Sequence, residues 1–280
     1  MRLSLKVNTF EYPDGTQALS GIDLEIRHGE FAGILGANGS GKTTLLKALD
    51  GLIKDFDGRA LLDGQDMRAL SPKEIYRKVG MVFQNPDDQL FASSVFEDIS
   101  FGPTNMGFSD EEVSQRVADA LKSVEMTEFA RKSIHNLSFG QKKRVCIAGL
   151  LAMGHQILLL DEPTAGLDPM GEYKMMGLLK KLNETGVTTV MATHSVDLVP
   201  LFLHSLYILS KGSFVRSGTP EEVFTAPEEM SNVKLRLPQI AELIYRLKNQ
   251  DKLHFEKIPL TIGEARREII KLYKMSAMKF

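Results

Sequence analysis

The sequence holds a single cysteine, Cys146, among its 280 residues, so no disulfide can form within the chain. Cys146 stands in the apolar run 145–153, where a buried structural thiol is expected rather than a reactive one. That run is also the longest apolar stretch, and it is much shorter than the ~18 residues that a membrane-spanning helix needs. Residues 1–5 offer neither a basic head nor an apolar signal core. We therefore expect a cytosolic protein whose membrane role, if it has one, comes through a partner.

A strong charge of either sign is also missing. The formal net charge is −2 and the pI is about 6.3, whereas domains that bind nucleic acid are usually strongly basic. We therefore expect no nucleic-acid partner. The histidines share no ligand-like spacing with one another or with the cysteine, so we expect no transition-metal site in this chain. They are His28, His135, His155, His194, His204 and His254.

Two kinds of hydrophobic pattern predict strands. Apolar residues alternate with polar ones in 3–7 and in 22–26, which predicts antiparallel strands with one covered face. Unbroken apolar runs at 31–35, 157–160 and 188–192 predict strands of a parallel sheet that is covered on both faces. A helix predicted over 171–185, with Gly186 as its C-cap, follows the second run.

The middle and the end of the chain are predicted to be helical. Helical spacing of apolar residues predicts helices over 111–124 and 139–153, within an inserted helical subdomain of about 85–153. We expect this subdomain to belong to a domain of residues 1–236. A small C-terminal extension of residues 237–280 follows, with helices predicted near 243–247 and 264–273.

A glycine-rich loop follows the strand predicted at 31–35 and precedes a helix predicted from Leu45 onward. This strand–loop–helix order is the context that a phosphate-binding loop requires. Glycines leave backbone N–H groups free to face phosphates, the lysine adds positive charge, and the threonine hydroxyl can ligate Mg²⁺. The loop by itself predicts only that a nucleoside triphosphate binds, and the predicted nucleotide-binding residues of this segment are Gly36, Ala37, Asn38, Gly39, Ser40, Gly41, Lys42, Thr43 and Thr44. The fold class is therefore α/β, a P-loop NTPase core with a mixed, largely parallel sheet and an antiparallel β subdomain.

Two carboxylates follow the apolar strand at 157–160. Asp161 is placed where a second Mg²⁺ anchor is needed, and Glu162 stands where a carboxylate can polarise a water for attack on the γ-phosphate. An isolated Asp-Glu pair would be an ordinary helix start. In combination with the glycine loop, the pair predicts ATP hydrolysis.

The segment Leu137-Ser138-Phe139-Gly140-Gln141 resembles the signature of the nucleotide-binding subunits of ABC transporters, and this resemblance covers nearly the whole chain. It implies that Ser138 and the Gly140 backbone reach the γ-phosphate held by the opposite subunit. It also implies that Gln84 contacts Mg²⁺ and water, that His194 senses the γ-phosphate, and that residues 165–168 form a dimer-contacting loop.

The same resemblance implies that Tyr12 stacks on adenine. A half-exposed strand tyrosine is the plain alternative, and Phe10 is a competing candidate for the stack. Phe139 departs from the family, which usually has glycine there. Because phenylalanine does not readily adopt positive φ, we expect ordinary backbone angles and a ring that projects away from the nucleotide. Simple tolerance of the substitution is the alternative.

A narrower likeness involves residues 82–91 and 101–103, which closely resemble the ATPases of energy-coupling-factor importers. Residues 140–145 and the C-terminal tail resemble the cobalt and nickel branch. The resemblance implies a second ATPase subunit, identical or paralogous, and an integral membrane subunit that docks near Gln84–Phe101. It further implies a separate membrane protein that captures the substrate, and a peripheral location on the cytoplasmic face of a prokaryotic cell membrane.

Several alternatives remain open from the sequence. Leu90, Phe91 and Val95 are apolar and can form the docking surface, or they can complete the core of the helical subdomain. The cargo can be cobalt, nickel or a vitamin. ATPases of DNA maintenance share the signature but insert long coiled coils, and ribosome-associated ATPases usually carry two cassettes. This chain has one cassette and no such insertion.

Overall fold

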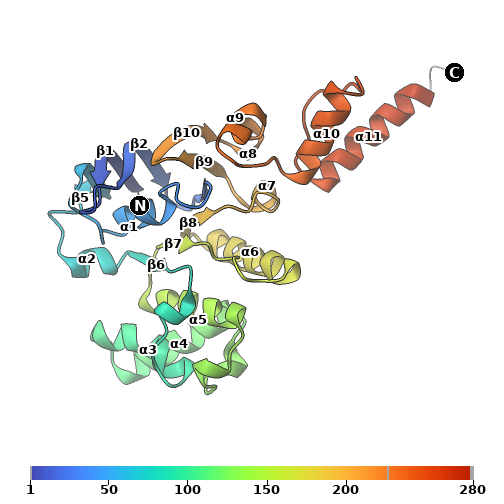
Figure 1. Ribbon diagram of the computed structural model, residues 1–280. Coiled ribbons are helices and arrows are strands. Elements are labelled where there is room, and N and C mark those ends of the chain that lie inside the picture. The colour runs from blue at the N-terminus through green and yellow to red at the C-terminus, as the bar shows by residue number, and fades with distance from the viewer. Residues whose placement is uncertain (1, 226, 278–280) are drawn as a thin grey trace.

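The computed structural model describes residues 2–225 and 227–277 (Figure 1). Met1, Ala226 and residues 278–280 of the predicted ranges lie outside this part. The strands are β1 (Arg2–Glu11), β2 (Gln17–Arg27), β3 (Phe31–Leu35), β4 (Asp57–Leu62), β5 (Gln65–Asp66), β6 (Val79–Val82), β7 (Ile157–Asp161), β8 (Thr188–Thr193), β9 (Ser205–Ser210) and β10 (Ser213–Gly218). The α-helices are α1 (Lys42–Leu49), α2 (Pro72–Tyr76), α3 (Val95–Asn105), α4 (Asp110–Ser123), α5 (Phe139–Met153), α6 (Pro169–Glu184), α7 (Val199–Phe202), α8 (Pro220–Val223), α9 (Pro227–Asn232), α10 (Gln239–Asn249) and α11 (Ile262–Ala277). Short 3-10 helices are η1 (Pro86–Asp88), η2 (Thr127–Phe129) and η3 (Ile134–Asn136).

The alternating segments form an antiparallel sheet, as predicted. Within the described residues it has four strands in the order β2-β1-β4-β5. Leu3 pairs with Ile26 and Leu5 with Leu24, and all four side chains are buried on one face. The polar residues between them are exposed on the other face, as period-two alternation requires.

The unbroken apolar runs form the second sheet, whose described strands lie in the order β10-β9-β3-β8-β7-β6. Neighbours from β9 to β6 are parallel, and β10 pairs antiparallel with β9 at the edge. Every residue of β3, β6, β7 and β8 is buried. Both faces of this sheet are therefore covered, which explains why its strands show no alternation.

Helices fill the spaces on either side of the parallel sheet. Helix α1 lies between the two sheets, where Leu45 and Leu46 share one apolar core with Ile34 and the strands β1 and β2 (Figure 1). On the opposite face Leu158 and Leu160 join a second core with α5 and α6. The carboxyl ends of β3 and β7 consequently meet at one edge beside the start of α1.

Two helices begin earlier than their hydrophobic patterns predict. Helix α1 starts at Lys42 rather than Leu45, because its first residues are polar and face a cavity instead of the core. Helix α6 starts at Pro169, with proline at the favoured first position. The carboxylate of Asp168 caps this helix by accepting a hydrogen bond from Gly171 N at 2.6 Å.

Between β6 and β7 the described chain forms helices that contact one another extensively, chiefly α3 with α5 and α4 with α5. Val113, Val117 and Leu121 bury one face of α4, as their spacing predicts. Figure 1 shows this group at the bottom of the view, below β6 and β7, with the antiparallel sheet at the upper left. The chain enters this group of helices from β6 and leaves it into β7, so these two strands connect it to the parallel sheet.

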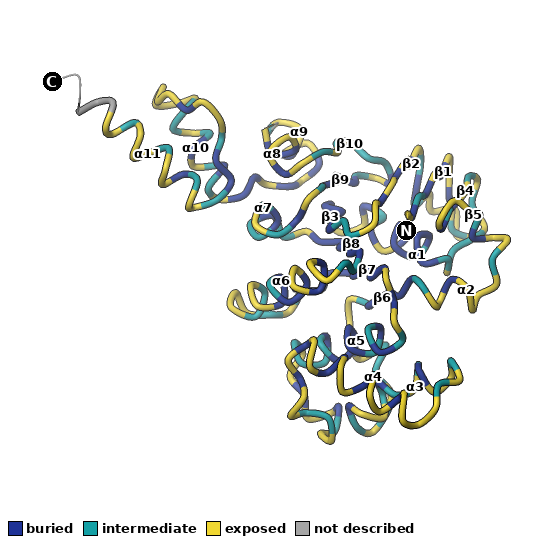
Figure 2. The backbone as a smooth tube through the Cα atoms, turned by 180° about the vertical axis from the view of Figure 1, so that it is seen from behind, coloured by how far each residue is buried: buried dark blue, intermediate teal, exposed yellow. Residues whose placement is uncertain are grey.

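Helices α10 and α11 project from the body beyond α7 and α8 (Figures 1 and 2). They share a small core that contains Ile244, Phe255 and Ala265. Asp197 holds the segment before them, accepting a hydrogen bond from Gln239 N at 2.9 Å and pairing with Arg236. Both helices are longer than the ranges predicted from the sequence. Among the described helices, none combines the length and the apolar character that crossing a bilayer requires.

Candidate functional site

The glycine-rich loop connects β3 to α1 at the edge where the parallel strands end. Gly39 has φ +77° and Gly41 has φ +105°, values that residues with a side chain rarely adopt. A Cβ on Gly41 would lie 2.7 Å from the carbonyl oxygen of Ala18. The loop can therefore wrap closely around a ligand only with glycine at these positions.

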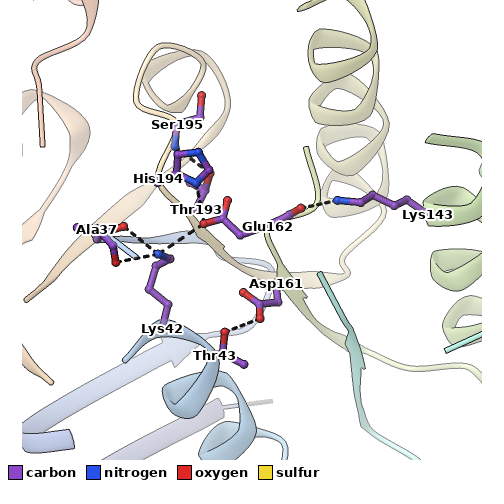
Figure 3. A network of polar contacts seen from close by, with 10 residues as sticks. Ala37, Lys42, Thr43, Lys143, Asp161, Glu162, Thr193, His194 and Ser195 are labelled. Carbon is purple, nitrogen blue, oxygen red and sulfur yellow. Dashed lines mark hydrogen bonds and ion pairs between the residues drawn. The ribbon is translucent and has the colours of Figure 1, made fainter. Parts of the chain in front are cut away.

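Lys42 gathers the oxygens of the loop around its ammonium group (Figure 3). Its Nζ donates to Gly36 O at 2.8 Å and to Ala37 O at 3.2 Å, and it lies 3.5 Å from Glu162 Oε1. The side chains of Lys42 and Glu162 are both buried, at 7% and 6% exposure. Charges so poorly hydrated interact strongly with each other and with any anion that enters the loop.

Thr43 and Asp161 bring two oxygen donors together. Thr43 Oγ1 donates to Asp161 Oδ2 at 2.6 Å (Figure 3). Burial raises the pKa of Asp161 above its ordinary value, and the bond from Thr43 opposes that rise. The exposed Gln84 lines the same cavity and adds an amide oxygen.

This donor set fits Mg²⁺, which is held by oxygen ligands, commonly one or two carboxylates together with substrate phosphates. The described residues contain no group of three or more His, Cys, Asp or Glu side chains that could hold a metal by themselves. A magnesium site here thus needs phosphate oxygens to complete it.

The carboxylate of Glu162 lies between Lys42 of the glycine loop and the residue that follows β8. Its Oε1 lies 2.9 Å from Nδ1 of His194, the residue that follows β8 (Figure 3). The imidazole is 55% exposed, whereas the carboxylate is nearly buried. Glu162 thus lines the cavity, whereas the predicted His194 is not among the residues of its wall and contacts it through the Glu162 carboxylate.

A cavity of ≈ 660 Å³ collects most of the predicted nucleotide residues. Its walls are Tyr12, Thr16, Gln17, Ala18, Asn38, Gly39, Gly41, Lys42, Thr43, Thr44, Gln84, Asp161, Glu162, Lys211 and Gly212. Tyr12 contacts Thr44 through their hydroxyl oxygens at 3.0 Å. Phe10 packs against the Tyr12 ring at 5.0 Å between centroids but is itself in the core. Among these two aromatics, Tyr12 is therefore the one that lines the cavity.

Three predicted loop residues, Gly36, Ala37 and Ser40, are not among the residues that line this cavity. Gly36 and Ala37 contribute the carbonyl oxygens that contact Lys42. Ser40 is buried, and within the described residues its Oγ has no hydrogen-bond partner.

Ser138 and Gly140 line a different cavity, of ≈ 260 Å³, at the start of α5. Ser138 Oγ accepts a hydrogen bond from Gln141 N at 3.3 Å, and the Gln141 side chain accepts from Ser138 N in return. This reciprocal capping box fixes the helix start and leaves the serine exposed. The structure therefore does not bring the predicted signature residues to the nucleotide loop of the same chain.

Phe139 has the ordinary backbone angles that we expected, since it opens α5 and its φ is not positive. Its ring lies over Gly166, where an added Cβ would be 3.1 Å from a ring atom. The apolar residues near η1 divide between the two alternatives. Val95 is fully buried in the core and Leu90 packs against it, so both belong to the helical core, whereas Phe91 is 66% exposed.

Sequence reasoning missed several residues of this region, including Thr16, Gln17 and Ala18 in the cavity wall. Lys211 and Gly212, in the turn between β9 and β10, line the larger cavity, and Gly212 N donates to Ser40 O at 2.9 Å. Lys143 donates to the carbonyl oxygen of Glu162 at 2.6 Å. Neither contact leaves a signal in the sequence, because strand order and helix packing bring these segments together.

Comparison with known proteins places this geometry in a family. The family model described as ABC transporter matches residues 19–165. A protein of Geobacter sulfurreducens, named as an ABC transporter ATP-binding protein, is 68% identical over 97% of this chain and 98% of its own length. The energy-coupling factor transporter ATP-binding protein EcfA of Methanococcus maripaludis is 48% identical, over 95% of this chain and 96% of its own.

Solved structures agree with this assignment. Clostridium perfringens cbiO1, described as part of the ABC transporter complex cbiONQ, has a TM-score of 0.76 and 43% identity, covering 87% of this chain and 98% of that one. An ATP-binding cassette solved as a post-hydrolysis dimer with ADP and Pi has a TM-score of 0.69 and 32% identity, over 78% and 98% of the two chains. The P-loop fold with mixed sheets is thus established. The chain belongs to the ABC transporter family, and it is one of the family's ATP-binding, ATP-hydrolysing subunits.

Proposed function

We propose that this chain is the ATP-hydrolysing subunit of an energy-coupling-factor importer that takes up a transition-metal ion, cobalt or nickel. One observation carries the proposal. Lys42, Glu162 and His194 converge at the glycine loop, whereas Ser138 lines a separate cavity. A site divided in this way suits an ATPase whose two subunits complete each other's pockets.

In this proposal the glycine loop binds the triphosphate of ATP. Backbone N–H groups of Gly41, Lys42 and Thr43 face the phosphates at the start of α1, where the helix dipole favours anions. Lys42 pairs with the β- and γ-phosphates. Mg²⁺ held by Thr43, Asp161 and Gln84 neutralises phosphate charge when it is bound. Tyr12 stacks on the adenine base.

Glu162 acts as the general base. Its carboxylate takes a proton from a water as that oxygen forms a bond to the γ-phosphorus and the bond to ADP breaks. His194, 2.9 Å from this carboxylate, fixes its orientation and contacts the γ-phosphate. Both groups act on ATP that is bound to their own chain.

The partner ATPase subunit, identical or paralogous, supplies its Ser138 and Gly140 backbone to the γ-phosphate. ATP binding then closes the pair and hydrolysis reopens it, because the γ-phosphate is the contact that differs between the two states. We also propose that residues 237–280 contribute to this pairing. Leu243 and Tyr273 are exposed apolar side chains on α10 and α11, at 49% and 75%.

An integral membrane subunit docks near Gln84–Phe101. The rings of Phe91 and Phe101 contact each other edge to face, with 4.8 Å between their centroids. Both residues remain more than half exposed, at 66% and 53%. Two adjacent exposed rings are the kind of apolar patch that protein partners cover. A separate membrane protein captures the substrate, and this chain lies on the cytoplasmic face of a prokaryotic membrane.

The likeness to cbiO1 and the Gly140–Val145 segment favour a metal cargo. The relatives named EcfA support the transporter class without specifying a cargo, so a vitamin importer is the alternative. Uptake assays with radioactive cobalt, nickel and a vitamin, in cells that express this chain with its genomic neighbours, separate the two. Uptake of a vitamin alone would contradict the metal assignment.

The Glu162→Gln variant tests the ATPase mechanism. We expect it to form a stable ATP-bound dimer while turnover falls at least about 100-fold, since the base is lost and the volume is kept. Gel filtration with ATP and a phosphate-release assay measure the two effects. Near-full turnover would remove Glu162 from its assigned role.

A further inference from the structure

Lys143 is a fully buried lysine on α5, five residues beyond Ser138, with 1% exposure. Its Nζ donates to the carbonyl oxygen of Glu162 at 2.6 Å (Figure 3). Burial lowers the pKa of Lys143 to about 8, while the charge of Glu162 opposes that fall. A buried ammonium group is destabilising unless it is well paired. Its position on the main chain of Glu162 therefore calls for a role that an apolar side chain could not fill.

Glu162 adopts a backbone conformation that needs such support. Its φ is +48°, in the left-handed region that a glutamate seldom enters. Its N–H donates to Ala192 O at 2.9 Å, and its carbonyl oxygen accepts from Ala165 N at 3.1 Å as well as from the Lys143 ammonium at 2.6 Å. Both main-chain polar groups are thus held, which fixes the direction in which the carboxylate leaves the chain toward Lys42 and His194.

The ring of Phe139 completes this arrangement on the outer side. The Nζ of Lys143 lies 5.1 Å from its centroid, within the range of a cation–π interaction. The same ring rests on Gly166, in the loop that joins β7 to α6. Phe139 thus contacts both the buried ammonium and the loop that follows the base.

We propose that Lys143 is a positioning residue which, shielded by Phe139, connects the signature segment of α5 to the main chain of Glu162. This inference rests on the proposed function, in which Ser138 contacts the nucleotide of the opposite subunit. Because Ser138 and Lys143 share one rigid helix, movement of the signature toward that nucleotide also displaces the support of Glu162. Through Lys143, the position of Glu162 at the chain's own nucleotide is therefore coupled to the closure of Ser138 around the nucleotide of the opposite subunit.

Lys143→Met removes the donor and keeps an unbranched side chain, whereas Lys143→Arg keeps donors. For Lys143→Met we expect kcat to fall about 10- to 100-fold, while the Kd for ATP and the KM stay within about threefold, because the lysine touches no nucleotide. Lys143→Arg should recover part of the loss. Lys122→Met, at an exposed position on α4, is the matched control and should leave turnover unchanged.

A second readout separates positioning from simple core packing. In a Glu162→Gln background, Lys143→Met should leave ATP-dependent dimer formation intact, because closure uses the signature and not the base. Phe139→Leu should lower kcat about threefold, and the double variant should be no slower than Lys143→Met alone, because the ring acts through the lysine.

The outcomes distinguish this inference from the function on which it rests. If Glu162→Gln is inactive but Lys143→Met turns over normally, the inference is overturned and the proposed function stands. If Glu162→Gln keeps full turnover, the proposed function itself fails. Should Lys143→Met fail to fold, Phe139→Leu carries the test, and an unchanged kcat in that variant overturns the inference.

Discussion

The glycine-loop face and the signature face of this molecule differ in how much of a nucleotide site each contains. The loop face has a cavity of ≈ 660 Å³ whose walls include Lys42, Asp161 and Glu162, all buried. The signature face has a cavity of ≈ 260 Å³ beside an exposed Ser138. The first can bind a triphosphate and position a base. The second offers helix-start donors, and the one carboxylate among the described residues that line it, Glu125, is paired with Arg144 and Lys181. This asymmetry is what a site shared between two chains requires.

Substitution of Lys42 by alanine removes the central cation of the glycine-loop face. Of the substitutions proposed here, it should lower ATP hydrolysis the most. Removing the buried charge also leaves Glu162 without its cationic neighbour, so we expect kcat/KM for ATP to fall at least about 1,000-fold. Calorimetric titration with ATP and a phosphate-release assay measure the change. Lys180→Ala, at an exposed position on α6, is the control; comparable losses in both variants would argue against a specific role for Lys42.

Substitution of Ser138 by alanine removes a hydroxyl from the signature face and leaves the glycine-loop face unchanged. We expect turnover to fall about tenfold while ATP affinity of the isolated chain is unchanged, because in the proposed mechanism the hydroxyl acts on the opposite nucleotide. The change also removes the N-cap of α5. Ser109→Ala removes the equivalent cap of α4 and controls for that loss. A fall in ATP affinity of the dilute chain would place Ser138 in its own site.

Substitution of Tyr12 by alanine tests whether its ring stacks on the adenine base at the glycine-loop face. A stacked aromatic contributes about 1–3 kcal/mol to base binding, so the Kd for ATP should rise about tenfold. Tyr12→Phe keeps the ring and loses the contact to Thr44, and should stay within about twofold of the wild type. If the alanine variant binds ATP normally, Tyr12 is an ordinary strand tyrosine.

Asp50 lies outside both cavities and tests the scaffold alone. Burial raises its pKa from 3.8 to about 7 in the folded chain, so the folded state binds this proton more tightly than the unfolded state. Its contribution to stability is full below about pH 4 and is lost as the pH rises through about 7. Asp50→Asn should therefore raise the free energy of unfolding at pH 8 by up to about 4 kcal/mol, and change it little at pH 4. Urea unfolding across this pH range, with the exposed Asp55→Asn as control, measures the effect; parallel pH curves for wild type and Asp50→Asn would refute it.

The two faces also differ in how far the sequence alone predicts them. The loop face follows from local signals, because a buried strand, Gly39 and Gly41, and a helix are adjacent in the chain. Asp161 and Glu162 could be added since the ends of parallel strands meet at one edge. The support behind the site could not be predicted. Lys143 reaches Glu162 only through the packing of α5 on the sheet, and the positive φ of Glu162 has no residue-type signal.

Exposure in the helical region was equally hard to predict. Leu90, Phe91 and Val95 have similar hydrophobicity, yet Val95 is buried in the core and Phe91 is exposed. Val95 is the first residue of α3 and belongs to its buried face, whereas Phe91 precedes this helix. Sequence pattern could identify the group but could not assign its members to core or surface.

The most direct test of the divided site is the dependence of ATP hydrolysis on protein concentration. We predict that the rate per chain, with saturating magnesium and ATP, rises as dilute monomers associate and then reaches a plateau, because a single chain has no signature at its own glycine loop. A strictly monomeric preparation that hydrolyses ATP as fast per chain as a concentrated one would contradict the account.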